Sequence, residues 1–399
     1  MTPVPEAALP LAGVRVVDLT RIYSGPYCTF LMGIAGAEII KVEPPEGEHL
    51  RTRKARAGAS LPFPMLNANK RHVTIAIKTA QGRELVLLLA ERADVLVENF
   101  RPGVMDELGL GRDVLRQRNP RLIYASTNGF GSSGPYRDYA AMDLTIQALG
   151  GVMDSTGFAG NPPVKAGPAI GDFFAGIHLF GAIVAALYHR ERTGEALAPE
   201  VAMLEAVYPS LCSSLGMVMG DALLIPRTGN RHGGLNQCPY NVYPAADGYF
   251  AIICTSDRHW QSLLTALGRK DLDQSRFATI SDRVRHMDEI DEEISRVTAK
   301  ETRAELTKKL NAAGVPCGAV QSLSEVIRDP QLHASGMLRE LDHPEFGPIV
   351  VSHSALTYRD HPRAPYRASG SLGRDNRSVF SEIGLKDEDL QRLSRAGVI

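Results

Sequence analysis

An aspartate stands directly before a long apolar segment, in the step Gly171-Asp172. The apolar run over residues 173–189 predicts a buried helix, so Asp172 would cap that helix and lie in the positive field of its amino terminus. That field holds the carboxylate ionised, and a carboxylate presented to a cleft can act as a covalent nucleophile. On the residues alone, a plain helix cap is the commoner explanation of the same pattern.

Two groups of basic and polar residues adjoin predicted strand ends, where α/β sheets place their ligands. One is NANKR at residues 67–71, and the other is ENFRPG at residues 98–103. Lysine, arginine and nearby amides suit phosphate groups, and Phe100 offers an aromatic face for a purine. Solvated loop charges explain the same composition, and spacing alone slightly favours that explanation.

Weaker patterns complete the set of candidates. The segment GFGSSGPY at residues 129–136 is glycine-rich, but it matches neither a dinucleotide fingerprint nor a Walker loop. His232 could act as an acid, a base or an anion contact, although a lone loop histidine usually has no catalytic role. The sequence lacks HExxH, GxSxG and carboxylate-rich metal motifs. Five scattered cysteines without a CxxC pair indicate a reducing compartment.

The segments that must position these residues alternate between strands and helices. Strands are predicted at residues 13–19, 37–42, 73–77, 95–98 and 122–127, and helices at 26–34, 82–92, 113–118, 143–149, 173–189 and 201–219. This order predicts an α/β fold whose large domain has a mostly parallel, Rossmann-like sheet. A second β-alternating unit over residues 243–255, followed by charged helical sequence, predicts a smaller α/β domain. We expect the large domain over residues 1–224 and 326–399, and the small one over 225–325.

Composition and charge limit the classes of partner. The 44 Lys and Arg residues balance 45 Asp and Glu residues to a formal net charge of −1, so no bulk basic surface favours nucleic acid or anionic lipid. The first residues lack the order of a signal peptide, and no apolar run reaches the ~18 residues of a membrane span. We therefore expect a cytoplasmic protein with neither a nucleic-acid nor a membrane partner.

Taken in order, many segments resemble the class III CoA-transferases, a family that includes formyl-CoA and carnitine CoA-transferases and the related acyl-CoA racemases. The resemblance runs from about Leu11 to about Tyr358. It is carried by LAGVRVVDLTRIYSGPYCT, GAEIIKVEPPEGEHLR, NANKRHVTIAIKTAQG, DVLVENFRPGVMDELGLG, NPRLIYASTNGFGSSGPYRD, AMDLTIQALGGVMDSTG, PAIGDFFAGIHLFGAIVAALYHRERTGEA and GVPCGAV. It implies CoA transfer from an acyl-CoA to a free carboxylic acid, with CoA as substrate and no permanently bound cofactor or metal. It also implies a homodimer of two ring-shaped chains threaded through each other.

The resemblance also assigns roles to residues. It places the nucleophile, the aspartate of a GD or AD step before a helix, at Asp172. It places the CoA pocket at Tyr23, Ser24, Asn69, Lys70, Arg71, Asn99, Phe100 and Arg101. A short dicarboxylate such as oxalate, succinate or a C5 acid is expected as substrate, because Arg21, Arg231 and His232 could cluster near the site.

Two departures from the family pattern bear on function. Met142-Asp143 stands at the substrate site where family transferases often have Tyr before the acidic residue and racemases have His. Met142 cannot exchange a proton, which favours a transferase over a 2-methylacyl-CoA racemase or epimerase. The strand end that carries a glycine-rich flap in formyl-CoA transferases reads Cys254-Thr255-Ser256-Asp257, so any lid must be built differently. A CoA-binding paralogue without turnover is the remaining alternative.

Overall fold

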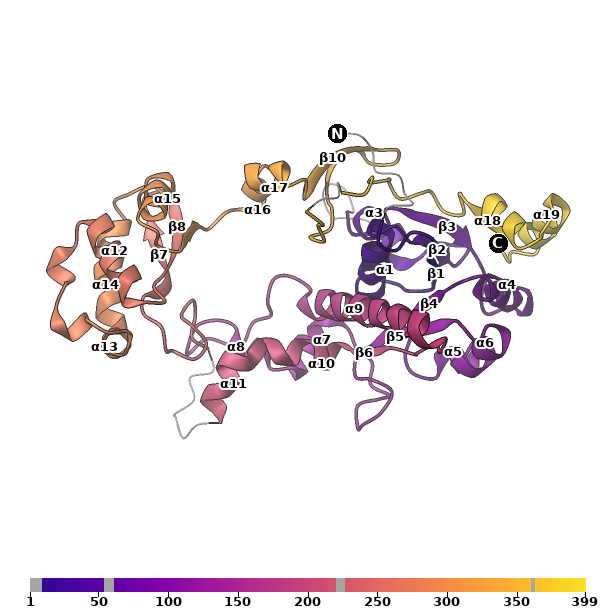
Figure 1. The fold of residues 1–399 in the computed structure, drawn as a ribbon, viewed down its shortest axis with the longest axis horizontal. Helices are drawn as coiled ribbons and strands as arrows, with labels where there is room; N and C mark the ends of the chain where they lie inside the picture. The colour runs from indigo at the N-terminus through magenta and orange to yellow at the C-terminus, as the bar shows by residue number, and fades with distance from the viewer. Residues whose placement is uncertain (1–8, 54–60, 220–226, 360–362) are drawn as a thin grey trace. The chain divides into compact units, whose positions relative to one another are not determined.

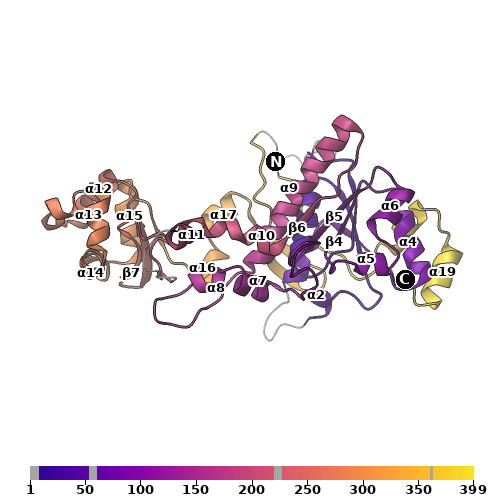
Figure 2. The same ribbon diagram turned by 90° about the horizontal axis from the view of Figure 1, so that it is seen from below.

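The computed structural model describes residues 9–53, 61–219, 227–359 and 363–399, which Figures 1 and 2 show from two sides. The chain divides into two compact units. The first comprises Met1–Ile146, Pro168–Val207 and Arg328–Ile399, and the second comprises Gln147–Gly167 and Tyr208–Ile327. The domain limits expected from the sequence remain a prediction.

Six parallel strands form the sheet of the first unit, in the order β3-β2-β1-β4-β5-β6. They are β1 (Arg15–Asp18), β2 (Glu38–Glu43), β3 (Lys70–Thr74), β4 (Val95–Glu98), β5 (Ile123–Asn128) and β6 (Glu200–Ala202). The strand order reverses between β1 and β4, which makes this point the topological switch of the sheet. The predicted α/β class with a mostly parallel sheet is therefore confirmed.

Helices cover both faces of this sheet (Figure 1). The helices of this unit are α1 (Ser24–Ile34), α2 (His49–Thr52), α3 (Pro62–Leu66), α4 (Ala80–Glu91), α5 (Val104–Glu107), α6 (Arg112–Arg118), α9 (Ile170–Thr193), α10 (Met203–Val207), α17 (Pro330–Ala334), α18 (Asn376–Glu382) and α19 (Asp387–Arg395), and α7 (Asp143–Leu149) starts in this unit. Successive strand residues point to opposite faces, so Val16 packs with α1 and α9 while Val17 packs with α4 and α18. A β10–β11 hairpin (Leu338–His343 and Gly347–Ser352) completes the unit.

The structure corrects two of the predicted elements. Residues 201–219 are not one helix, because residues 200–202 pair in parallel with β5 and extend the sheet at its edge. The chain then forms α10, a 3₁₀ turn (Tyr208–Leu211) and α11 (Cys212–Val218). The third strand begins at Lys70 rather than at residue 73, because its pairing with β2 runs from Ile39 opposite Lys70 to Glu43 opposite Thr74.

Helix α9 is the longest element that the structure describes. By length and composition alone it could cross a membrane, so the expectation that no such run exists is wrong. Core helices pass the same test, and Leu179 and Ile183 of α9 are buried against the strands. Its place against the sheet accounts for its apolar sequence.

The second unit has its own sheet and core (Figure 2). Its antiparallel strands are β7 (Tyr240–Ala245), β8 (Gly248–Ile253) and β9 (Cys317–Ala319), and its helices are α8 (Val152–Ser155), α11, α12 (Asp257–Leu267), α13 (Ile280–Arg285), α14 (Met287–Thr298), α15 (Arg303–Ala312) and α16 (Leu323–Val326), with short 3₁₀ turns at Lys270–Leu272 and Ser275–Phe277. Trp260, Phe250 and Phe277 are fully buried in the core that the three strands form with α12, α13, α14 and α15.

Candidate functional site

A pocket of about 230 Å³ lies at the switch point of the first unit's sheet. Its walls come from the segments that follow β1, β4 and β5 and from the first turn of α9. Because the carboxyl ends of parallel strands meet at one edge of a sheet, a switch point at that edge is where such folds bind ligands. Of the predicted site residues, the structure brings together in this pocket Arg21, Ser24, Asn99, Phe100, Arg101, Met142 and Asp172.

Asp172 lies in the first turn of α9 and is only 7% exposed. It does not cap the helix as predicted, because the cap position is Ala169. The backbone N–H of Gly171 instead donates to Asp143 Oδ1 at 2.9 Å. The carboxylate of Asp143 thus takes a free helix donor, which leaves the Asp172 side chain available to the pocket.

Burial and charge set the protonation of Asp172. Burial raises the pKa of its carboxyl group to about 7, and the neighbouring Asp143 carboxylate adds to this rise. Hydrogen bonds from the backbone and side chain of Ser24 act in the opposite direction on the pKa. The sequence predicted that the positive end of the helix keeps Asp172 ionised, and burial and the Asp143 carboxylate act against that ionisation. A pKa near neutrality is typical of groups that act as nucleophiles or bases.

Cationic and aromatic side chains line the rest of the pocket. The guanidinium of Arg21 lies 5.2 Å from the ring centre of Phe100, a cation–π distance. Asn99 fixes the backbone of Arg21, because its Oδ1 accepts from the Arg21 N–H at 2.8 Å and its Nδ2 donates to the Arg21 carbonyl at 2.7 Å. Arg101 lines the same pocket. Guanidinium groups beside an aromatic face suit a ligand with phosphates or carboxylates and a planar ring.

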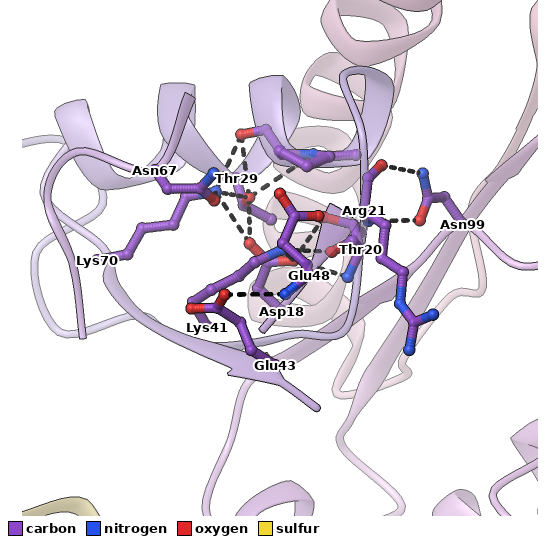
Figure 3. A network of polar contacts seen from close by, with 12 residues as sticks. Asp18, Thr20, Arg21, Thr29, Lys41, Glu43, Glu48, Asn67, Lys70 and Asn99 are labelled. Carbon is purple, nitrogen blue, oxygen red and sulfur yellow. Dashed lines mark hydrogen bonds and ion pairs between the residues drawn. The ribbon is translucent and has the colours of Figure 1, made fainter. Parts of the chain in front are cut away.

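The remaining residues predicted for the CoA pocket lie outside its lining. Tyr23 packs against Phe173, with 6.2 Å between their ring centres. Asn69 donates to the Pro365 carbonyl at 2.8 Å. Lys70 is buried and donates to Asp18 Oδ2 at 3.0 Å (Figure 3).

Arg71 forms ion pairs with Glu38 and, at 2.7 Å, with Glu382. The NANKR group precedes and begins β3, so it lies at the amino end of that strand, away from the edge where the pocket opens.

Arg231 and His232 belong to the second unit. Arg231 pairs with Asp288 at 2.6 Å and with Asp291 at 2.7 Å. His232 accepts from the Gly234 N–H at 3.1 Å. These contacts lie within the second unit.

The sequence did not single out several residues that line the pocket. Arg137 and Tyr139 come from the loop after β5 and Thr127 from the end of that strand, whereas Phe130 of the same loop belongs to the glycine-rich candidate segment at residues 129–136. The rings of Phe130 and Tyr139 have centres 6.1 Å apart, and Tyr136 stacks on Tyr139 at 5.1 Å. Their shared position after β5, which the sequence did predict as a strand, is the signal that could have found them.

Comparison with known proteins gives a consistent result. The model of CoA-transferase family III matches residues 11–376. The chain is 37% identical to a formyl-CoA:oxalate CoA-transferase of Streptomyces avermitilis, over 98% of this chain and 99% of the relative. It is 34% identical to a succinyl-CoA–D-citramalate CoA-transferase of Chloroflexus aurantiacus, over 98% of each chain. A solved CaiB/BaiF family protein of Brucella suis superposes with a TM-score of 0.82 and 34% identity, over 94% of this chain and 99% of that one.

The fold and its neighbours define the class: the protein is a CoA-transferase, an enzyme that uses acyl-CoA as a substrate. More narrowly, the chain belongs to CoA-transferase family III. The family resemblance found in the sequence is thereby confirmed.

Proposed function

We propose that this enzyme moves CoA from an acyl-CoA to a short dicarboxylic acid, with Asp172 as the covalent nucleophile. The observation that carries the proposal is a buried carboxylate of pKa about 7 in a pocket lined by arginines. The names of two relatives add support, since they contain oxalate and D-citramalate, which are both dicarboxylates. Arg21 and Arg137 offer more positive charge than a monocarboxylate would need.

In the proposed reaction the Asp172 carboxylate attacks the thioester carbonyl, the C–S bond breaks, and CoA leaves as a thiolate from a mixed anhydride. The thiolate then attacks the aspartyl carbonyl, which releases the first acid and forms an aspartyl-CoA thioester. The incoming carboxylate attacks this thioester and expels the thiolate, which attacks the new acyl carbonyl. Asp172 is regenerated as a carboxylate, and no net proton is consumed.

The pocket residues have distinct parts in this proposal. Phe100 offers a face to the adenine and Arg101 a charge to the phosphates of CoA. Hydrogen bonds from Ser24 orient the Asp172 carboxylate, and backbone amides at residues 129–134 could hold the developing oxyanion. Water must be excluded from the anhydride, because hydrolysis would waste the acyl-CoA.

Met142 supports transfer rather than racemisation. Its thioether lines the pocket and cannot carry a proton to or from an α-carbon. Incubation of a 2-methylacyl-CoA in deuterated water should therefore leave the α-carbon unlabelled at the catalytic rate. Label entering at that rate would favour the racemase.

From the family resemblance we also propose an interlocked homodimer in the cytoplasm. Ile177 and Tyr188 of α9 are exposed apolar residues in the single chain, which suits burial by a second copy. Light scattering of the full chain should give twice the chain mass, and a monomer mass would contradict the dimer.

The covalent intermediate gives the direct test. With succinyl-CoA or formyl-CoA as donor and no acceptor acid, we expect an acyl or CoA adduct on Asp172, because the second half-reaction lacks its carboxylate. Hydroxylamine should convert the adduct to a hydroxamate at Asp172 and inactivate the enzyme in step with labelling, as read by peptide mass spectrometry. The donors are then screened against oxalate, succinate, glutarate and mesaconate.

Other outcomes contradict the proposal in recognisable ways. An adduct on serine, cysteine or histidine would identify another nucleophile. Rapid CoA release without any adduct would indicate a hydrolase, and Asp172→Asn serves as the matched control that should form no adduct.

A further inference from the structure

A cluster of buried charges lies at the end of β1 (Figure 3). The Asp18 carboxylate accepts hydrogen bonds from the Thr20 N–H at 2.9 Å, the Thr29 hydroxyl at 2.6 Å and Lys70 Nζ at 3.0 Å. Lys41 Nζ lies 3.8 Å from Asp18 Oδ1. All of these side chains are buried. Apart from Lys70, which the family resemblance assigned to the CoA pocket, the proposed reaction leaves this cluster without a role.

The cluster supports the turn at residues 20–24, which joins β1 to α1 and lines the pocket through Arg21, Ile22 and Ser24. Lys41 Nζ donates to the Thr20 carbonyl, and the Ile22 N–H donates to Glu48 Oε2 at 3.3 Å. The contacts with Lys41 and Glu48 therefore hold the Thr20 carbonyl and the Ile22 N–H, which are two successive parts of the turn, in place.

Ile22 is the strained point of this turn. Its φ of +68° lies in the left-handed region, which a β-branched residue adopts rarely and at an energetic cost. Such a conformation persists where neighbouring contacts impose it. Glu48 is 2% exposed, and its Oε1 has no hydrogen-bond partner among the residues that the structure describes. The contact of Glu48 to Ile22 is thus one of few that the buried carboxylate makes.

The turn fits closely against the helices that follow it. A side-chain carbon at Gly25 would meet the Thr20 side chain at 2.3 Å, and one at Gly176 would meet the Ser24 carbonyl at 2.6 Å. Gly176 lies one helical turn after Asp172 on α9. A shift of the turn would therefore move Ser24 relative to the Asp172 carboxylate, to which it donates.

We propose that Glu48 is a positioning residue for the reaction: it holds Ile22 in the left-handed conformation and so places Ser24 against the Asp172 carboxylate. Lys41, Lys70 and Asp18 fix the base of the same turn. This role rests on the proposed function of Asp172, whereas the contact between Glu48 and Ile22 does not. Lys70 accordingly affects the site indirectly, through its hydrogen bond to Asp18.

The protonation of Asp172 reports the position of Ser24. Asp143 and the pocket arginines at 21, 101 and 137 also face this site, and the substitutions below leave them unchanged. Around Glu48, burial raises the pKa of its carboxyl group, Lys41 and Lys70 oppose the rise, and Glu43 adds to it. Because Ser24 lowers the pKa of Asp172, a displaced turn should move the acidic limb of the kcat/KM profile to higher pH.

Two substitutions separate the reach of Glu48 from its charge. Glu48→Gln keeps an oxygen within reach of the Ile22 N–H, whereas Glu48→Asp keeps the charge and shortens the side chain by one carbon. For Glu48→Asp we expect amide exchange in peptides covering residues 20–24 to become about tenfold faster or more. We also expect its acidic limb to rise by about half a pH unit, with KM for the donor within about threefold of wild type. Glu48→Gln should match the wild type in both measurements.

Arg190→Met is the control for a merely structural loss, because Arg190 is equally buried but lies at the far end of α9, where it pairs with Asp94 at 2.7 Å. It should lower the unfolding midpoint without moving the acidic limb. Adding Ile22→Gly to Glu48→Asp should restore the limb, because glycine adopts a positive φ without help. Activity is measured on the full chain with the donor and acceptor that turn over fastest in the screen.

Wild-type exchange at residues 20–24 and a wild-type limb in Glu48→Asp would overturn the proposal. A larger change in amide exchange or in the acidic limb for Glu48→Gln than for Glu48→Asp would also overturn the proposal, because the effect would then come from the charge of Glu48. If Asp172→Asn keeps its transferase activity, the proposed nucleophile fails, and the exchange rates at residues 20–24 still decide what Glu48 does.

Discussion

Two aspartates of the first unit are buried to almost the same degree, but their pKa values are shifted in opposite directions. Asp18 is 0% exposed and Asp172 is 7% exposed. Lys41 and Lys70 with the hydroxyls of Thr20 and Thr29 overcome the cost of burial and hold the pKa of Asp18 far below its ordinary value. Asp172 has Ser24 as donor and Asp143 as a like charge, and its pKa rises to about 7.

The difference shows that partners, and not depth, decide what a buried carboxylate can do. A carboxylate with two ammonium partners is fully compensated and serves the structure. One with few partners remains under-stabilised, which makes its charge available to a substrate. The turn at residues 20–24 connects the two sites, so the cluster around Asp18 supports the position of the groups around Asp172.

The largest expected effect separates the two aspartates by activity. Asp172→Asn should lower CoA transfer by at least about 10³-fold, because it removes the nucleophile, while CoA affinity stays within about tenfold. Initial rates and calorimetric titration with CoA measure the two quantities. Substantial turnover by this variant would remove Asp172 from the chemistry.

The next effect concerns stability and applies to Asp18. Its pKa is lowered on folding, so it stabilises the protein above the pKa of the unfolded chain, and that stability is lost as the pH falls through the folded value. Asp18→Asn should lower the free energy of unfolding at pH 8 by about 3–5 kcal/mol, because it leaves two buried lysines uncompensated. Urea titration followed by circular dichroism measures the change. A loss below about 1 kcal/mol would mean that the cluster is not compensated as described.

Asp172→Asn should change stability in the opposite direction. The folded pKa of Asp172 lies above the unfolded one, so the favourable contribution of its protonated form is complete below about pH 4 and is lost as the pH rises through about 7. At pH 8 the variant should be more stable than the wild type by about 2–4 kcal/mol, and at pH 4 the two should be nearly equal. An equal gain at both values of pH would point to packing rather than charge.

Binding of CoA compares the two arginines that the sequence assigned to one pocket. Arg101→Ala should weaken CoA by about 10–100-fold, because it removes a charge-assisted phosphate contact. Arg71→Ala should weaken it by less than about threefold, because Glu38 and Glu382 already bind that guanidinium. An equal loss of CoA affinity in both variants would indicate that Arg71 also binds CoA.

The smallest effect tests the like charge beside Asp172. Asp143→Asn keeps an oxygen for the Gly171 N–H but removes the repulsion that raises the pKa of Asp172. The acidic limb of kcat/KM should therefore move to lower pH by less than about one unit. A shift to higher pH would show that Asp143 acts by another route.

The sequence was sufficient for five of the six strands of the sheet, although β6 was expected to be helical, and for the part of the site that follows those five strands. Phe100 and Asp172 were found because they follow a strand and open a helix, and these signals are local. Lys70 lies outside the lining of the pocket, and the sequence could not show this because strand direction and register, which put it at the amino end of β3, depend on distant pairing. The pKa of Asp172 could not be foreseen either, because burial and the Asp143 carboxylate arise from tertiary packing.

Helix α9 imposes a constraint that concerns the length of the chain rather than its residue types. It carries Asp172 in its first turn and Arg190 in its last, and Arg190 donates to Asp94 at 2.7 Å and to the Arg121 carbonyl at 2.9 Å. These partners stand before β4 and β5, so the helix is anchored at the opposite edge of the sheet from the pocket. One inserted or deleted residue between them would rotate the carboxylate by about 100°. Insertions and deletions should therefore be excluded from residues 173–189 even where single substitutions are tolerated.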